Sequence, residues 1–378
     1  MKVSILTQPL GRNYGGLLQA YALQCCLKKL GCDVVTLNRP KALPLKLRAT
    51  SWIKLFIKKL LAVLGMKKFR QTNSNPYLKL EKFRDRFVSI SPLIDSDRKL
   101  LYYYSKNFFD ALIVGSDQVW RPRYSPKLTN YFFDFCDDLN LNSKRIAYAA
   151  SFGVDYKEFS EEEVEVCRHL ARKFDAISVR EASGVNLVKD YFDMPSELVF
   201  DPTLLLDCAD YECVIERDRS EGLDYHGGLL AYVLDMDDKK EEFVSEVSGT
   251  ISDAPFYLLN KPFSAPGQDS VHADCYPSVG DWLNSFRLAK FVVTDSFHGC
   301  VFSIIFNKPF LVIGNKSRGL ARFNSLLKNF GLERRLVENV DKFDQSLALE
   351  TIDWEQVNKL KRCGREKSIE FLRGSLSL

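Results

Sequence analysis

Short apolar runs, each ending in a polar or glycine-containing turn, most constrain the fold of this chain. In the clearest example, residues 291–294 read Phe-Val-Val-Thr, followed by Asp-Ser-Phe-His-Gly and an apolar stretch at 301–306. A short apolar run without alternation is typical of a strand buried on both faces of a parallel sheet. The segment therefore predicts a strand, a turn and a helix packed on the sheet. Such a turn presents backbone N–H groups, and Ser296 and His298 add side-chain donors, so it suits an anion.

The pattern recurs in two series along the chain. The expected strands lie at 3–6, 34–37, 111–114, 146–150, 176–179 and 198–200, and then at 229–234, 255–259, 291–294 and 310–313. Helical patterns separate several of them, one starting at Gly15 and ending at Gly31, which favours mostly parallel sheets. A chain of 378 residues exceeds what one core usually supports. We predict an α/β fold with two Rossmann-like domains facing a central cleft, at 1–205 and 206–350, and a C-terminal helix within 351–378 that docks back on the first domain.

Two further turns and one arginine are candidate ligand sites, because open α/β sheets bind ligands at the carboxyl ends of their strands. The glycines of residues 11–16 let the backbone approach a ligand, or merely permit a tight turn. Within residues 115–120, Asp117 either faces a ligand or caps a helix. Arg180 follows a buried strand and is placed for bidentate contact with phosphate or carboxylate. A salt bridge from Arg180 to Glu181 or to a nearby acid is the alternative.

Positive charge is concentrated in an insertion at about residues 39–80. No Asp or Glu occurs between Val34 and Leu80, whereas eleven Lys and Arg do, although the whole chain carries a net charge of only +4. Apolar residues including Trp52 and Phe56 recur there at helical spacing. A basic amphipathic helix of this kind binds an anionic membrane surface, here through residues 39–70, or packs its apolar face on its own domain. No nucleic-acid-binding motif accompanies the charge, so nucleic acid is not an expected partner.

The remaining composition predicts a cytoplasmic protein, in peripheral contact with the inner membrane surface if the basic insertion binds lipid. No window reaches about 18 uncharged apolar residues, and the N-terminus opens into a strand pattern instead of a signal peptide. The ten cysteines form no CxxC pair and are expected to be buried thiols. The four histidines lie far apart without ligand-spaced partners, so no metal site is expected.

Five short motifs occur in order along the chain: NYGGLLQAYAL at 13–23, GSDQVW at 115–120, SVRE at 178–181, FDPT at 200–203 and SFHG at 296–299. Taken together, they make the sequence similar to the polysaccharide pyruvyl transferases, over roughly residues 3–335. The resemblance implies a GT-B-like fold, phosphoenolpyruvate as donor substrate and a sugar or lipid-linked oligosaccharide as acceptor. It also implies ketal formation in cell-surface or exopolysaccharide biosynthesis, with no cofactor required.

The resemblance and the chemistry of the donor suggest roles for particular residues. Arg180 and His298 are expected to hold the donor, helped by Ser296 and the Gly299 amide, and His298 is also the candidate proton donor. Residues with less specific signals are the candidate bases Asp117 and Asp295, the candidate phosphate ligands Arg318 and Arg322, and the acceptor-side residues Asn13, Tyr14, Gly15, Gly16 and Gln118.

One departure from the family pattern leaves alternatives open. Other branches of the family carry arginine two places before the motif histidine, where this chain has Ser296. A donor contact made by that arginine must then come from elsewhere, or the donor is held differently. A glycosyltransferase of the same architecture that uses a nucleotide sugar is the nearest alternative, although no signature for a base and ribose is present. The second alternative is a non-catalytic sugar-binding protein of a polysaccharide assembly complex.

Overall fold

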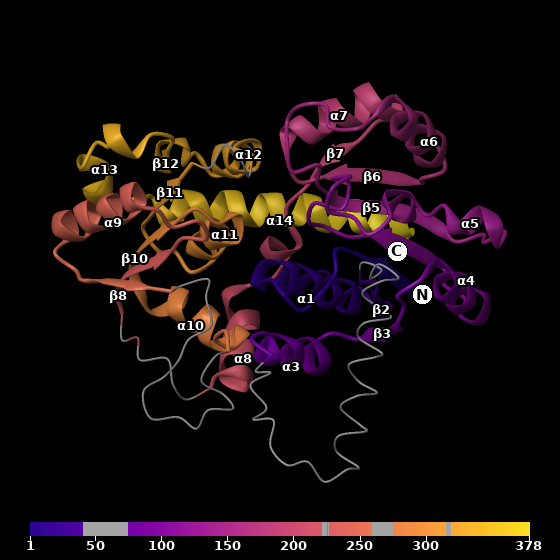
Figure 1. The fold of residues 1–378 in the computed structure, drawn as a ribbon, viewed down its shortest axis with the longest axis horizontal. Coiled ribbons are helices and arrows are strands. Elements are labelled where there is room, and N and C mark those ends of the chain that lie inside the picture. The colour runs from indigo at the N-terminus through magenta and orange to yellow at the C-terminus, as the bar shows by residue number, and fades with distance from the viewer. Residues whose placement is uncertain (41–74, 221–224, 226, 259–274, 315–318) are drawn as a thin grey trace, which may run out of the picture.

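The computed structural model describes residues 1–40, 75–220, 225, 227–258, 275–314 and 319–378, which form two α/β domains side by side (Figure 1). The first sheet has the strand order β3-β2-β1-β4-β5-β6-β7, and the second has the order β12-β11-β10-β8-β9. All neighbouring strands in both sheets are parallel, which confirms the predicted fold class. The strands are β1 (Lys2–Leu6), β2 (Asp33–Asn38), β3 (Ile90–Leu93), β4 (Ala111–Val114), β5 (Lys144–Ala150), β6 (Ala176–Val179), β7 (Glu197–Leu198), β8 (Gly228–Tyr232), β9 (Pro255–Tyr257), β10 (Ala289–Thr294), β11 (Phe310–Ile313) and β12 (Leu336–Val337).

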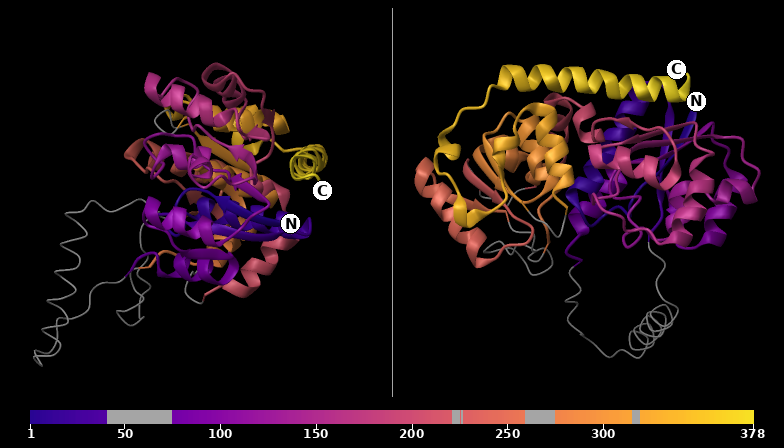
Figure 2. Two further views of the ribbon diagram at one scale, coloured as in Figure 1. Left: turned by 90° about the vertical axis from the view of Figure 1, so that its right-hand side faces the viewer. Right: turned by 90° about the horizontal axis from the view of Figure 1, so that it is seen from above.

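Helices cover both faces of each sheet, as the buried apolar runs of the strands require. The longest, α14, runs along both domains and ends beside the N-terminus (Figure 2). Its last turns bury Phe371, Leu372 and Leu376 against β1, β4 and β5, on the face that α1 also covers. The helices are α1 (Tyr14–Lys29), α3 (Leu78–Phe87), α4 (Asp97–Lys106), α5 (Phe135–Asp138), α6 (Glu161–Ala171), α7 (Ala182–Phe192), α8 (Cys208–Asp218), α9 (Asp238–Ile251), α10 (Val279–Leu288), α11 (Phe297–Ile305), α12 (Ala321–Phe330), α13 (Ser346–Leu349) and α14 (Trp354–Leu376).

Sheet edges are where the sequence prediction fails. Strands β3 and β12 were not predicted, and the strand expected at 198–200 ends at Leu198. Strand β3 contains Pro92 and β12 has two residues, so neither shows the apolar run of a central strand. After β7 the chain turns away, and the Phe200 amide donates to Ser368 Oγ of α14 at 2.9 Å. Tertiary contacts with α14 thus replace the expected ladder.

Several predictions concern residues at or beyond the described ranges. The basic segment at 41–74 and Arg318 lie outside the described residues. Arg39, which belongs to the predicted membrane-binding stretch, is buried and paired with Asp97 and Asn130, so its guanidinium is not available to lipid. No helix among the described residues is long and apolar enough to cross a membrane.

The cysteine prediction is only partly right. All ten cysteines are free, but Cys213 and Cys363 are exposed, and Cys25 and Cys208 are partly so. Each of the exposed pair lies on the outer side of a helix, α8 or α14. The fold leaves a cysteine at such a position accessible to solvent.

Candidate active site

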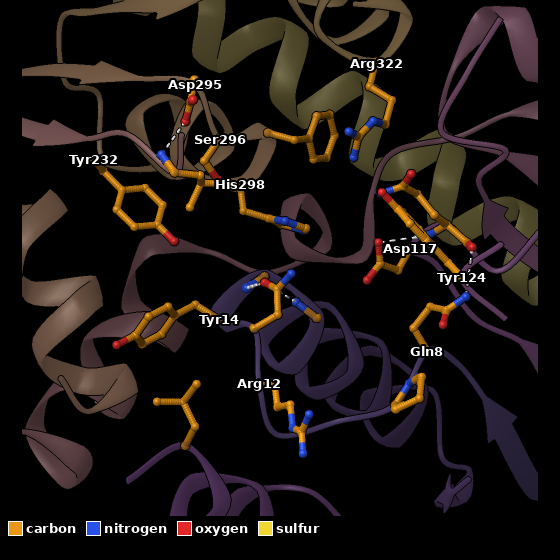
Figure 3. Close-up of a pocket in the computed structure, with 18 of the residues that line it drawn as sticks. Gln8, Arg12, Tyr14, Asp117, Tyr124, Tyr232, Asp295, Ser296, His298 and Arg322 are labelled. Atoms are coloured by element: carbon orange, nitrogen blue, oxygen red, sulfur yellow. Dashed lines mark hydrogen bonds between the residues drawn. The ribbon is translucent and has the colours of Figure 1, made fainter. Parts of the chain in front are cut away.

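A cavity of about 500 Å³ lies where the two domains meet (Figure 3). The first domain lines it with the loops that follow β1 and β4, and the second with the loops that follow β8 and β10 and with α12. These loops leave the carboxyl ends of parallel strands, where α/β sheets bind ligands. The lining residues include Gln8, Arg12, Asn13, Tyr14, Gly15, Gly16, Asp117, Gln118, Arg121, Arg123, Tyr124, Tyr232, Tyr276, Trp282, Asp295, Ser296, His298 and Arg322.

His298 lies in the first turn of α11, at the seam between the domains. Its side chain is only 10% exposed, and Nε2 has no hydrogen-bond partner among the described residues. A carboxylate oxygen, Asp201 Oδ1, lies 3.8 Å from that nitrogen, which is too long for a hydrogen bond. Across the seam, a Cβ built on Gly15 would lie 2.0 Å from His298 Nδ1. The glycine turn of α1 therefore makes room for the imidazole of the other domain.

Ser296 and Gly299 stabilise the turn instead of offering free donors. Ser296 caps α11, because its Oγ accepts a hydrogen bond from the Gly299 amide at 3.3 Å. That amide is therefore already used, and the expected contact between the Gly299 N–H and the donor is not supported. A Cβ on Gly299 would lie 2.3 Å from Thr294 Oγ1, so glycine is needed here for close packing of α11 on β10.

Arg180 does not lie among the residues that line the cavity, contrary to the prediction of direct donor contact. Its side chain is 1% exposed, and Nη1 donates to Asp201 Oδ2 at 2.7 Å. Nη2 lies 3.5 Å from Asp117 Oδ1, and Nε lies 3.7 Å from Glu181 Oε2. The alternative of a salt bridge to a nearby acid is correct, because three carboxylates surround this buried guanidinium.

Asp117 lines the cavity but caps no helix, so the capping alternative is wrong. Its backbone φ is 77°, a left-handed conformation, and its Oδ1 accepts a hydrogen bond from the Gln118 amide at 2.9 Å. The Gln118 side chain is also engaged, because its Oε1 accepts from Arg121 Nη1 at 2.9 Å. The two side chains thus form part of a polar network along one wall, in contrast to Trp120, which is fully buried in the core.

Asp295 holds the loop that follows β8. Its Oδ1 accepts from the Leu234 amide at 2.6 Å, and its Oδ2 accepts from Lys240 Nζ at 3.1 Å and from the Asp235 amide at 3.3 Å. A carboxylate with both oxygens engaged in this way is well suited to position a loop. Its role as a base for the acceptor hydroxyl stays a prediction.

The N-terminal turn is built by its own side chains. Asn13 Oδ1 caps α1 by accepting from the amides of Gly15 at 2.9 Å and Gly16 at 3.3 Å. Tyr14 reaches into the second domain, where its hydroxyl donates to the Pro277 carbonyl at 2.7 Å. These two residues border the cavity, but their hydrogen bonds hold the turn and the contact between the domains in place.

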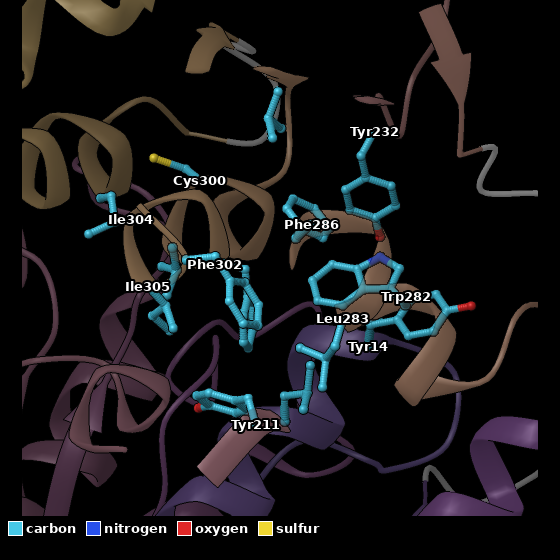
Figure 4. Packing of buried hydrophobic residues seen from close by; sticks show 14 of the residues in the cluster. Tyr14, Tyr211, Tyr232, Trp282, Leu283, Phe286, Cys300, Phe302, Ile304 and Ile305 are labelled. Atoms are coloured by element: carbon cyan, nitrogen blue, oxygen red, sulfur yellow. The ribbon is translucent and has the colours of Figure 1, made fainter. Parts of the chain in front are cut away.

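The apolar floor behind the turn is continuous between the domains (Figure 4). Tyr14 stacks on Trp282 of α10 with ring centroids 5.2 Å apart, and Trp282 contacts Phe302 of α11 edge-on at 5.2 Å. Leu17 and Leu18 of α1 belong to the same buried cluster. A shared apolar core of this kind opposes relative motion of the two domains, so the loops around the cavity are held in fixed register.

Arginines supply most of the charge of the cavity. Arg12, Arg121 and Arg123 line it and were not singled out in the sequence, whereas Arg322 was. The pKa of Arg322 is lowered to about 10, first by burial and then by the neighbouring Arg180. Arg12 lies within the glycine-containing turn at 11–16, whereas Arg121 and Arg123 come after the GSDQVW motif and had no local signal.

Burial of His298 predicts a pH dependence of stability. Burial lowers the pKa of the imidazole, which Asp201 opposes and Arg180 reinforces. The unfolded chain therefore binds a proton here at a pH where the folded chain does not, and the free energy of unfolding should fall as pH drops below about 6.5, by up to about 1.4 kcal/mol per pH unit. His298→Asn should flatten the urea-unfolding profile between about pH 5 and 6.5. His169→Asn, at an exposed position on α6, is the matched control for loss of a histidine elsewhere.

His298 and Asp201 affect the free energy of unfolding in two separate pH ranges, so their contributions can be distinguished. The pKa of Asp201 is about 2, because the nearby His298 and Arg180 charges and the Thr203 hydrogen bonds outweigh the opposing effect of burial. Stability that depends on ionised Asp201 is therefore present above about pH 4 and lost only below it. A slope between pH 5 and 6.5 that survives in His298→Asn would contradict the assignment.

The fold is that of a two-domain α/β protein of the GT-B type, with a cavity between the domains. A family model described as polysaccharide pyruvyl transferase matches residues 13–317, and the chain belongs to this family. Among curated proteins, General stress protein 30 of Bacillus subtilis (strain 168) is 27% identical over 172 residues, which cover 44% of this chain and 46% of that protein. The match thus spans about half the length of that relative.

Solved structures agree on the architecture. Arabidopsis thaliana UGT89C1 complexed with UDP-L-rhamnose matches with a TM-score of 0.52 and 10% identity, covering 100% of this chain and 99% of that one. UDP-N-acetylglucosamine 2-epimerase from Rickettsia bellii matches with a TM-score of 0.52 and 10% identity, covering 100% and 97%. At this identity the likeness shows the fold alone.

Proposed function

We propose that the protein transfers the pyruvyl group of phosphoenolpyruvate to two hydroxyls of a sugar, forming a cyclic ketal and releasing phosphate. The observation that carries this proposal is the placement of His298, at the N-terminus of α11, in an arginine-lined cavity between the domains. A donor with a phosphate and a carboxylate needs fixed cationic groups, and its chemistry needs a proton donor close by. Membership of the family supports the same reaction.

The donor is proposed to occupy the arginine side of the cavity. Figure 3 shows His298 between Tyr232 and Tyr14 on one side and Arg322 and Asp117 on the other. The lowered pKa of Arg322 reflects a guanidinium that is buried and repelled by Arg180, and the attraction of a bound anion offsets both effects. Arg322 thus supplies the positive charge that, in other branches of the family, comes from an arginine two residues before the motif histidine. Arg318 remains a proposed ligand from the sequence alone.

The acceptor sugar is proposed to occupy the tyrosine side. Tyr232 and Tyr276 line the cavity, as does Asn13, one of the candidate acceptor-side residues. Sugar rings present apolar C–H faces as well as hydroxyls, so aromatic walls with a few polar groups suit them. A neutral sugar ring also suits this place, because the negatively charged Asp295 carboxylate does not repel it.

The reaction balances with one acid and two hydroxyls. His298 donates a proton to the methylene carbon of the donor, which leaves an oxocarbenium-like centre at the adjacent carbon, and a first sugar hydroxyl attacks it and loses its proton to a base. The carbon–oxygen bond to phosphate then breaks, and a second hydroxyl attacks the new cationic centre and loses its proton. One proton restores His298 and the other leaves with phosphate. Asp117 and Asp295 are the proposed bases.

Incubation with phosphoenolpyruvate and candidate sugars tests the proposal. Release of phosphate should require the acceptor and should match, mole for mole, the mass gain of a pyruvyl ketal on the sugar. A parallel incubation with UDP-sugars tests the glycosyltransferase alternative. Transfer of a sugar in that arm, without ketal formation in the first, would overturn the assignment.

The basic segment is proposed to bring the enzyme to lipid-linked acceptors at an anionic membrane surface. Its support is the sequence itself, which has no acidic residue between Val34 and Leu80. We expect the protein to sediment with vesicles containing anionic lipid and to be released by salt, because the attraction is screened. A variant with Lys54, Lys58 and Lys59 changed to Gln should sediment less. Equal sedimentation with neutral and anionic vesicles would refute the proposal.

A further inference from the structure

Asp201 of the FDPT motif lies directly behind the candidate proton donor, and nothing in the motif itself indicates a role for it. We propose that Asp201 is a positioning residue, which orients His298 and supplies the counter-charge of its protonated form. The kinetic consequences of this inference rest on the proposed transfer reaction. Its structural consequences do not, because they concern the imidazole of the free protein.

Asp201 joins elements that are far apart in the sequence. Its side chain is 1% exposed, and its Oδ2 accepts from Arg180 Nη1 at 2.7 Å and from Ser116 Oγ at 3.0 Å. Its Oδ1 accepts from the Thr203 amide at 3.0 Å and from Thr203 Oγ1 at 2.6 Å, and lies 3.8 Å from His298 Nε2. Four hydrogen bonds thus fix a carboxylate of the first domain against the imidazole of the second.

The unpartnered imidazole nitrogen is the observation that points to a role beyond packing. His298 Nε2 is buried without a hydrogen-bond partner among the described residues, although a carboxylate oxygen lies just beyond bonding distance. An orphaned buried polar atom is costly, so a fold that keeps one usually has a use for it. A shift of roughly 1 Å closes the gap to a charge-assisted bond, for which about 2.8 Å is typical.

The surrounding charges favour that closure when the donor binds. The charged groups that act on His298 are Asp201, Arg180, Asp117 and Arg322, whereas the α1 turn facing it contributes the uncharged Gly15. In the free protein, burial lowers the pKa of the imidazole. A polyanionic donor at Arg322 reduces the repulsion from the cations, and His298 then takes up a proton from solvent. Asp201 holds the protonated imidazole of His298 in place until the proton is transferred to the methylene carbon of the donor.

Histidine titration by NMR tests the inference in the free protein. In Asp201→Asn, which keeps the shape but removes the charge, the pKa of His298 should lie about one unit or more below the wild-type value. The His298 signal is assigned by its absence from His298→Asn. Asp281→Asn, a buried carboxylate at the N-terminus of α10, is the matched control and should leave the titration in place. An unchanged His298 titration in a folded Asp201→Asn would overturn the proposal.

A second variant keeps the test decisive if the first does not fold. Asp201→Asn leaves the Arg180 charge buried and unpaired, whereas Asp201→Asn/Arg180→Leu removes both charges together. The His298 pKa should still fall in the double variant, because Asp201 acts on the imidazole more strongly than Arg180. A rise or no change would refute the inference.

The kinetic arm separates this inference from the proposed function. In Asp201→Asn the acid limb of the rate profile should move to lower pH, with kcat reduced about 100-fold and a much smaller change in the KM for the donor. If the wild-type protein forms no ketal, the proposed function fails while the NMR result still decides the role of Asp201. If ketal forms and the profile of Asp201→Asn equals that of the wild type, the positioning role fails alone.

Discussion

His298→Ala is expected to abolish pyruvyl transfer, with a loss of at least about 1,000-fold in turnover, because the variant lacks the proposed acid for protonation of the donor. The residue lies at the N-terminus of α11, where the helix dipole and the neighbouring arginines also favour an anionic ligand. Phosphate release from phosphoenolpyruvate in the presence of an acceptor measures the effect.

The fold should survive the His298→Ala change. The ring fills space at the seam but makes no hydrogen bond through Nε2 among the described residues, so thermal unfolding should shift only modestly. His169→Ala, at an exposed position on α6, is the control for loss of a histidine elsewhere. Near-normal transfer by a folded His298→Ala would remove the imidazole from the mechanism.

Gly15→Ala is expected to reduce transfer about 100-fold, because the added methyl group displaces the imidazole from its place across the seam. The new Cβ would lie 2.0 Å from His298 Nδ1, closer than any real contact, and the stiff ring has to move. Gly16→Ala is a matched control one residue along the same helical turn, since its Cβ would meet nothing nearer than Asp117 Oδ2 at 3.6 Å. Turnover of the two variants under identical conditions gives the comparison.

A double variant identifies the cause of the Gly15 effect. Any loss of thermal stability in Gly15→Ala should largely disappear when His298→Ala removes the clashing ring, as a thermodynamic cycle for contacting residues requires. Alanine also favours the helix over glycine, so the double variant should be no less stable than His298→Ala alone. Equal turnover of Gly15→Ala and Gly16→Ala would show that this contact does not set the position of His298.

Much of the architecture could be predicted because local sequence encodes it. Runs such as Ala111–Val114 and Phe310–Ile313 are apolar on both faces, as is typical of central parallel strands, and the structure has strands with these bounds. The helix expected to start at Gly15 starts at Tyr14, and Asn13 caps it, a role that the sequence analysis did not assign to this residue. Edge strands β3 and β12 were missed because pairing with a neighbour, and not their own composition, makes them strands.

The candidate site was only partly predictable, for a different reason. Residues within recognisable turns, such as Ser296, His298 and Asn13, do border the cavity. Arg121 and Arg123 also border it, but they lie past the end of a motif and have no local pattern. Arg180 follows a strand as a ligand-binding arginine would, yet it is buried among carboxylates.

The sequence by itself determined the alternation of strands and helices, the parallel sheets and the turns that carry chemistry, because periodicity and turn composition act over a few residues. Only the tertiary structure decided which charges are paired and which face the cavity. Asp201, Arg180 and His298 are separated by 21 to 118 positions, and their mutual distances follow from how two domains pack. Burial and electrostatic pairing depend on such distances, so the roles of these residues emerge only when the domains meet.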